Sequence, residues 1–146
     1  MIDSREPPET RYQLGPPRRR EFEDGGTLCY KLDEGDYSVE LDAQLLAIRI
    51  ERKAIGDLFA CVGRERDRFE AELERLRPYR SYLIIEGTAA EVSAGIERSQ
   101  VSGKAAMTSV LCWSIRFGIS PIFAGNWRIG NAICQRLLEE AAIHEK

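Results

Sequence analysis

The 146-residue sequence contains a single histidine, His144, and its four cysteines are far apart, with no C-x-x-C pair. Because zinc sites are built from clustered cysteines and histidines, the sequence gives almost no support for one. A lone histidine also argues against histidine-based acid–base catalysis, so any chemistry must depend on carboxylates, lysines and a hard metal ion. Each cysteine lies in an apolar stretch and is interpreted as a small buried hydrophobic residue. These are Cys29, Cys61, Cys112 and Cys134.

Long apolar runs are also missing. No segment approaches the roughly 20 residues of a membrane span, and no signal peptide precedes Asp3. We therefore expect no membrane contact and, by default, a cytoplasmic location. The length fits one domain over residues 1–146, large enough to bury a core without disulfides or a structural metal.

Neither sign of charge predominates: the sequence has 21 Lys and Arg and 24 Asp and Glu, which gives a net charge of −3. Nucleic-acid binders usually favour a basic surface. A nuclease, however, gathers carboxylates to hold divalent metal, and the bound ions reverse the sign of the local field. The position of the arginines relative to those carboxylates therefore matters more than the total.

The pattern of apolar residues predicts an α/β domain. Alternating side chains predict strands from Thr27, over residues 37–41 and over 45–53, with turns at 33–35 and 42–44. A single helix is expected to end at Arg77-Pro78, with buried strands over 81–85 and 119–124. Further helices are expected over 88–97, 104–117 and 127–143. With a first strand that contains Asp3, the order β-β-β-β-α-β-α-α-β-α indicates a mixed β-sheet flanked by α-helices.

Asp36, Glu51 and Lys53 form the candidate chemical centre. Side chains alternate along a strand, so Glu51 and Lys53 point to one face and Arg52 to the other. A hairpin at residues 42–44 brings Asp36 beside Glu51. Two carboxylates from neighbouring strands suit a Mg²⁺ ion held against a phosphate oxygen, with Lys53 orienting or helping to deprotonate the attacking water.

Three longer motifs extend this pattern: Ile2-Asp3-Ser4-Arg5-Glu6, Gly35-Asp36-Tyr37, and Ile50-Glu51-Arg52-Lys53 followed by Asp57-Leu58. Together they resemble the nuclease domain of the XPF family of structure-selective endonucleases, within the PD-(D/E)XK superfamily. Arg64, Phe69 and the segment Tyr82 to Gly87 resemble it too. The resemblance implies a restriction-endonuclease-like mixed sheet flanked by α-helices.

The resemblance also implies roles for individual residues. Asp3, Asp36 and Glu51 would be the metal-site carboxylates for Mg²⁺ or Mn²⁺, and Lys53 the catalytic lysine. Arg52 and Asp57 would complete the catalytic group. The residues expected to support the site or contact DNA are Arg5, Glu6, Arg18, Arg19, Arg20 and Arg64.

The same resemblance implies partners. Family members pair through this domain, so a homodimer is expected, with the last helix and its neighbouring apolar surface as candidate contact. Larger relatives carry helix-hairpin-helix elements or a helicase domain, and this chain has neither. It therefore looks like a stand-alone, phage- or prophage-type member, for which an accessory protein could supply DNA affinity.

Plainer interpretations compete at several positions. Asp57 could simply favour the helix dipole, Arg5 and Glu6 could pair with neighbours, and Arg18 to Arg20 could form a solvated loop. Arg64 and Arg68 fit an ordinary charged helix face. Glu86, at the end of a buried strand, is interpreted as structural or supporting the site. Trp113 and Trp127 are interpreted as core or subunit-interface residues.

The sequence therefore favours a metal-dependent DNA endonuclease whose partner is branched or duplex DNA. The resemblance implies a preference for cutting branched, flap or forked structures. The alternative of a different class is a non-catalytic DNA-binding or scaffold subunit that pairs with an active nuclease. An RNA-directed nuclease is a third hypothesis.

Overall fold

The computed structural model describes residues 27–30, 35–41 and 44–144 of the chain. The predicted strand near Asp3 lies outside these residues. In chain order the elements are β1 (Thr27–Tyr30), β2 (Tyr37–Leu41), β3 (Gln44–Leu45), β4 (Ile48–Ala54), α2 (Ile55–Val62), α3 (Arg66–Leu76), β5 (Arg80–Glu86), α4 (Ala89–Ala94), α5 (Gly103–Phe117), β6 (Ile119–Phe123) and α6 (Trp127–His144).

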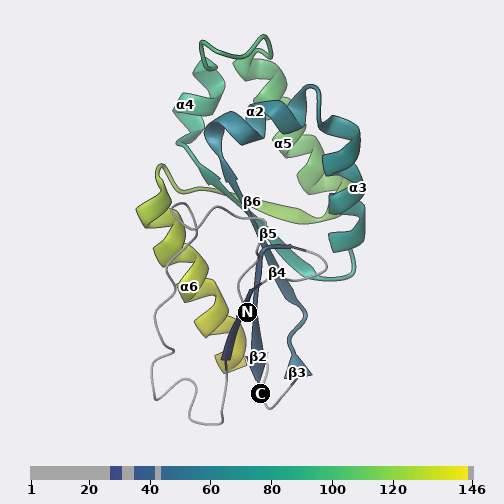
Figure 1. Ribbon diagram of the computed structural model, residues 1–146, viewed down its shortest axis with the longest axis vertical. Helices are drawn as coiled ribbons and strands as arrows, with labels where there is room; N and C mark the ends of the chain where they lie inside the picture. Colours follow the sequence, from purple (N-terminus) through teal and green to yellow (C-terminus); the bar gives the residue numbers. More distant parts are fainter. Residues whose placement is uncertain (1–26, 31–34, 42–43, 145–146) are drawn as a thin grey trace.

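A mixed sheet forms the centre of the molecule (Figure 1). Within the described residues its strands follow the order β1-β2-β4-β5-β6, and the short β3 pairs with β2. β2 runs antiparallel to β1, β3 and β4, whereas β4, β5 and β6 run parallel to one another. The predicted α/β class, a mixed sheet with meandering strands first and crossover units after them, is confirmed.

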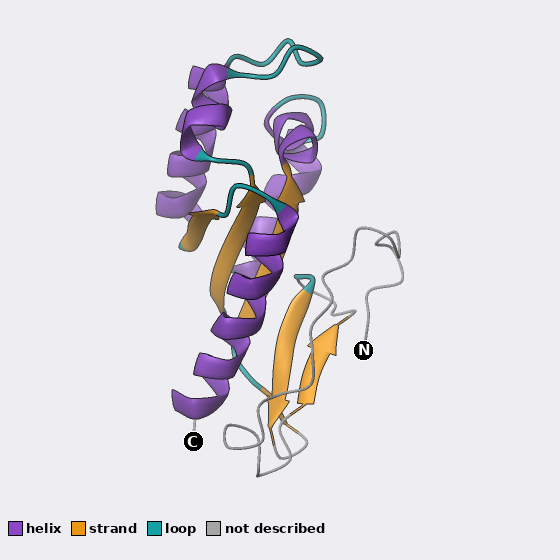
Figure 2. Cartoon of the chain, turned by 90° about the vertical axis from the view of Figure 1, so that its left-hand side faces the viewer, coloured by secondary structure: helices purple, strands orange, loops and turns teal. Residues whose placement is uncertain are grey.

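Helices cover both faces of this sheet. α6 lies along one face and faces the viewer in Figure 2, while α2, α3 and α5 pack on the other. Each face has its own apolar core, one around Trp113 and Leu83, the other around Tyr37, Ile84 and Leu138. Among the described helices, none combines the length and the hydropathy that a membrane crossing requires.

The central strand β4 divides its side chains between these two layers. Ile48 and Ile50 are buried in the apolar core beneath α6. On the opposite face, Lys53 lies over the ring of Phe69 in α3, with its Nζ 5.0 Å from the ring centroid. Because side chains alternate along a strand, Glu51 shares the face of Lys53.

The prediction of a single helix before Arg77-Pro78 is wrong. The structure has two helices there, α2 and α3. α2 ends at Gly63, whose N–H donates to the Phe59 carbonyl at 3.1 Å. A Cβ built on Gly63 would stand 3.1 Å from Val101, so the segment before α5 packs directly against this break. Both helices bury their apolar side chains in the same core. The apolar spacing in the sequence therefore continues across the break between the two helices and does not reveal it.

The tryptophans were expected in the core or at a subunit interface, and the cysteines were expected to be buried. Trp113 is fully buried, packs edge-on against Phe69, and donates its indole N–H to Glu70 at 2.8 Å. Trp127 is 46% exposed and so is not a core residue. Cys61 and Cys134 are buried and Cys112 is half-buried, while the side chain of Cys29 lies outside the description.

An ion pair joins the ends of β4 and β5. Arg52 donates through Nε and Nη2 to the two carboxylate oxygens of Glu86, at 2.6 and 3.1 Å. The two side chains are only 10% and 7% exposed. A two-pronged pair of this kind fixes geometry as well as charge. It therefore locks the register of the two parallel strands immediately beside Lys53.

We predict that Arg52→Met and Glu86→Gln each lower the free energy of unfolding by about 3 kcal/mol, because each leaves a buried charge without its partner. The double variant should lose less than the sum. Chemical denaturation of the three variants measures this coupling. As a matched control, Arg77→Met removes an exposed pair with Glu74 and should cost no more than about 1 kcal/mol. Additive losses at Arg52 and Glu86 would contradict the prediction.

Candidate active site

Asp36 follows directly on Gly35, which has a φ of 80°. This left-handed conformation favours glycine, and a Cβ there would also stand 3.2 Å from the Cβ of Arg49. The chain then enters β2, with the Asp36 N–H donating to the Ile50 carbonyl at 2.8 Å. The Asp36 carboxylate accepts a hydrogen bond from the backbone N–H of Arg52 at 2.9 Å. The structure therefore holds Asp36 against the strand that carries Glu51.

Glu51 and Lys53 form a pair on the face of β4 opposite Arg52. The Lys53 Nζ is 3.7 Å from Glu51 Oε2, and the two side chains are 20% and 8% exposed. Such a distance is an ion pair rather than a close hydrogen bond. Both groups are thus largely withdrawn from solvent, and Lys53 lines a cavity with Cys61 and Glu72.

The carboxylates around Lys53 determine its charge. Burial alone lowers the pKa of the Lys53 amine, but Glu51 above all, with Asp36 and Glu72 among the other neighbours, raises that pKa above its ordinary value. A raised pKa keeps the amine protonated throughout the neutral range. Lys53 is therefore a cation that can offset negative charge, and it is poorly suited to accept a proton from water.

Cys61 also lies at this site, on α2, but it has the character of an apolar residue. Burial is the main cause that raises the pKa of its thiol, and the positive charge of Lys53 only partly opposes this effect. The thiol therefore stays protonated at neutral pH. A buried protonated thiol is inert as a nucleophile, in agreement with the sequence interpretation.

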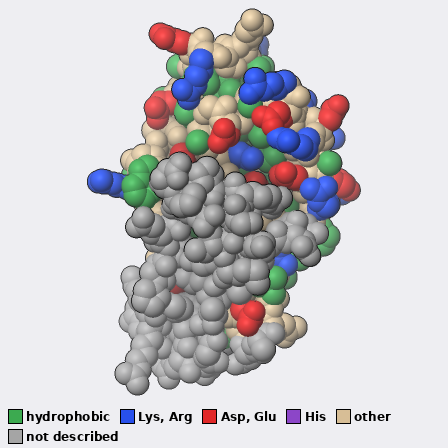
Figure 3. Space-filling view, in the orientation of Figure 1, with side chains coloured by type: hydrophobic (Ala, Val, Ile, Leu, Met, Phe, Trp, Pro, Cys, Tyr) green, Lys and Arg blue, Asp and Glu red, His purple; other side chains and the backbone are tan. Residues whose placement is uncertain are grey.

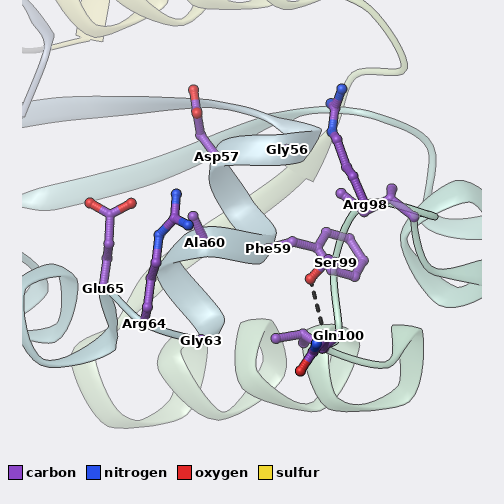
Figure 4. Close-up of a pocket in the computed structure, with 12 residues that line it drawn as sticks. Gly56, Asp57, Phe59, Ala60, Gly63, Arg64, Glu65, Arg98, Ser99 and Gln100 are labelled. Carbon is purple, nitrogen blue, oxygen red and sulfur yellow. Dashed lines mark hydrogen bonds between the residues drawn. The ribbon is translucent and has the colours of Figure 1, made fainter.

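Asp57 lies in the first turn of α2 and is exposed. There its negative charge interacts favourably with the helix dipole. This agrees with the interpretation of Asp57 as a residue that stabilises the start of the helix. Asp57 also lines two adjoining cavities. The smaller, of about 230 Å³, is shared with Lys53, Cys61 and Glu72. The larger, of about 590 Å³, is lined by residues of α2 and of the segment between α4 and α5 (Figure 4).

The carboxylates of Asp36 and Glu51 are suitable ligands for a hard divalent cation. Among the described residues no group of three or more His, Cys, Asp or Glu side chains is arranged to hold a metal ion. Mg²⁺, however, is commonly held by one or two carboxylates, with water and substrate phosphate completing its shell. The oxygen donors of Asp36 and Glu51, from adjacent strands, fit that minimal arrangement.

Several residues expected at the site cannot be placed. Asp3, Arg5, Glu6, Arg18, Arg19 and Arg20 lie outside the described residues. Arg64 is exposed and lines the larger cavity, where Figure 4 shows it on the same side of Gly56 as Asp57. Its neighbour Arg68 pairs with Glu65, as a charged helix face would predict.

Two residues of this region were not expected from the sequence. Glu72, one turn after Arg68 on α3, lines the smaller cavity, and Arg98 lines the larger one. Glu72 is concealed in a run of alternating charges, and Arg98 lies in a segment between helices without a recognisable motif. No local signal could have identified Arg98, because its approach to α2 depends on how distant segments pack.

Charged side chains of both signs cover this part of the surface. In Figure 3, Lys and Arg side chains lie interspersed with Asp and Glu over α2 and α3. This distribution agrees with the small net charge of the sequence. On the described part of this face, arginines therefore lie among carboxylates.

No family model matches the sequence, and no curated protein matches it either.

Solved structures do match the fold. XPF from Aeropyrum pernix superposes with a TM-score of 0.59 at 17% sequence identity, covering 77% of this chain and 52% of that one. XPF from Aeropyrum pernix in complex with DNA gives a TM-score of 0.57 at 19% identity, covering 80% and 52%. The chain thus spans about half the length of these proteins, and it shares the fold of XPF from Aeropyrum pernix.

Proposed function

We propose that this chain is a metal-dependent DNA endonuclease that hydrolyses phosphodiester bonds at duplex, branched, flap or forked sites. The observation that carries the proposal is the convergence of Asp36, Glu51 and Lys53 on one face of β2 and β4. The XPF-like fold supports it, and the similar structure from Aeropyrum pernix is a complex with DNA. The preference for branched substrates follows from the resemblance of the motifs.

In this mechanism Asp36 and Glu51 would hold Mg²⁺ or Mn²⁺. An ion bound there would polarise the phosphate, offset its charge and acidify the attacking water, whose proton would leave to solvent. The Lys53 ammonium orients the attacking water and stabilises the negative charge that develops on the phosphate oxygens. The low exposure of Glu51 and Lys53 strengthens these electrostatic effects, because little solvent screens them.

The remaining candidates have supporting roles. Arg52, tied to Glu86, fixes the end of β4 and offers its backbone N–H to Asp36. Asp57 lines both the larger cavity and the smaller one that contains Lys53, and Arg64 lines the larger, so we expect both to contact DNA. By resemblance, Asp3 is a further metal ligand. Arg5, Glu6, Arg18, Arg19 and Arg20 support the site or contact DNA.

The rival proposal is a non-catalytic subunit that binds DNA beside an active partner. A subunit without catalysis has no need to hold the charges of Asp36, Glu51 and Lys53 together, since burying them costs free energy. The arrangement therefore favours the enzyme. An accessory DNA-binding protein remains compatible with either proposal.

We predict metal-dependent cutting of labelled duplex, splayed-arm or flap DNA, with no cutting in EDTA. Asp36→Asn and Glu51→Gln should each reduce the cleavage rate by about 100-fold or more, because each removes charge that holds the ion. A gel assay with Mg²⁺ and with Mn²⁺ measures these rates. The substrate ranking gives the preference for structure.

Glu74→Gln is the matched control. Glu74 is an exposed carboxylate near the C-terminal end of α3, where it pairs with Arg77. It should cut at the wild-type rate. Binding without cutting in either metal would contradict the enzyme and favour the scaffold subunit. Cutting of the same structures made of RNA, but not of DNA, would identify an RNA-directed nuclease.

We also propose that two copies of this chain pair. Exposed apolar side chains occur on α5, where Leu111 and Ile115 are 54% and 86% exposed, and on α6, where Trp127 and Ile129 are 46% and 49% exposed. Clusters of exposed apolar and aromatic side chains are typical of subunit interfaces. The α6 group supports the expectation that the last helix contributes to the contact.

Sedimentation equilibrium tests this pairing. The wild-type chain should be a dimer, and Ile129→Glu should shift it to monomer, because a carboxylate buried without a partner opposes association. Ile115→Glu reports in the same way on the α5 surface. A monomeric wild-type chain at concentrations of tens of micromolar would contradict the proposal.

A further inference from the structure

The larger cavity, of about 590 Å³, lies between α2 and the segment that joins α4 to α5. It does not contain Asp36, Glu51 or Lys53, so the proposed hydrolysis does not account for it. Its volume is in the range of protein pockets that hold a small ligand. Its lining includes Gln100 and two arginines, Arg64 and Arg98, which lie on opposite sides of Gly56 (Figure 4).

Two arginines are available in this cavity. Arg64 and Arg98 are both exposed, and within the described part of the chain neither forms an ion pair. Of the two carboxylates in the lining, Glu65 is already held by Arg68. The other, Asp57, lies on the opposite side of Gly56 from Arg98 (Figure 4). The Arg98 end of the cavity is therefore the end suited to an anion.

Close packing fixes the position of Arg98. A Cβ built on Gly56 would stand 2.8 Å from Arg98 Nη2, so the guanidinium lies directly over the bare backbone at the start of α2. Ser99 accepts a hydrogen bond from the Val101 N–H at 3.1 Å, drawn in Figure 4, which holds the turn that carries Arg98. Val101 in turn packs on Gly63. The segment is thus held at both ends of α2.

The larger cavity adjoins the smaller cavity that contains Lys53. Asp57 and Glu65 line both the larger cavity and the smaller one, and Lys53 lines the smaller. A chain molecule that passes Lys53 can therefore continue over the first turn of α2 toward Arg98.

We infer that the larger cavity binds a backbone phosphate of the same DNA strand whose neighbouring phosphate is cut at Lys53. The inference rests on the proposed function. An arginine matches a phosphate because its planar guanidinium can donate two parallel hydrogen bonds. Arg98 supplies that contact, Arg64 adds positive charge, and the remaining volume accepts the attached nucleoside. The cavity thereby fixes which bond of the strand reaches the catalytic centre.

The test is a scan of methylphosphonates, in which one DNA phosphate at a time is made neutral. Binding of each DNA is measured in Ca²⁺ with the full chain. For the wild type, one phosphate on the cut strand should, when neutralised, weaken binding by about tenfold. Arg98→Ala should bind unmodified DNA about tenfold more weakly and be insensitive at that one position.

Two further variants sharpen the comparison. Arg98→Lys should recover part of the affinity, because it keeps the charge but not the two-pronged geometry. Arg75→Ala is the matched control: Arg75 is exposed, in the last turn of α3, and should give the wild-type scan. Loss of one phosphate contact should also lower the salt dependence of log Kd by about one unit in Arg98→Ala.

Identical scans for Arg98→Ala and the wild type, in a protein that cuts DNA, would overturn this inference and leave the proposed function intact. A wild-type chain that neither binds nor cuts any DNA would overturn both.

Discussion

The alternation of side chains along β4 is the constraint on which the candidate site depends. Ile48 and Ile50 must face the core beneath α6, because burying them contributes to stability. Glu51 and Lys53 are consequently held on the opposite face, and Arg52 returns to the first. A shift of one residue in register would exchange the two sets and bury both charges under α6. The apolar core and the polar site are therefore consequences of one register.

Two interactions stabilise that register where the strand ends. The Arg52 side chain donates two hydrogen bonds to Glu86 on β5. The Arg52 backbone N–H donates to Asp36, just before β2. One residue thus ties together the three strands that surround the site. Because Arg52 does this from the far face, the Glu51–Lys53 pair is positioned without a direct contact to it. Such support by neighbouring contacts is the usual requirement for precise polar sites.

Much of this arrangement could be predicted from the sequence because it depends on local geometry. Strand periodicity assigns faces to Glu51, Arg52 and Lys53, and a short turn brings Asp36 beside them. The break between α2 and α3 could not be predicted, since the apolar spacing continues across it. Nor could the position of Arg98, which lies against Gly56 in a distant part of the chain. Local sequence patterns therefore predict helices and strands, whereas cavities form where segments distant in the sequence pack together.

The likeness to XPF from Aeropyrum pernix concerns the fold, at 17% and 19% identity and about half the length of those chains. The chemistry must therefore be argued from the residues themselves. Net charge contributes little to that argument, because arginines and carboxylates are interspersed over α2 and α3. The distinguishing features are the burial of Glu51 and Lys53 and the cavities beside them.

The most direct test is to measure Mn²⁺ binding without DNA by electron paramagnetic resonance. If Asp36 and Glu51 share one ion, the wild-type chain should bind Mn²⁺ at a site that Asp36→Asn and Glu51→Gln each weaken by about tenfold or more. Glu74→Gln should leave that site unchanged. Mn²⁺ binding that is unaffected by both substitutions would show that the two carboxylates do not form a common metal site.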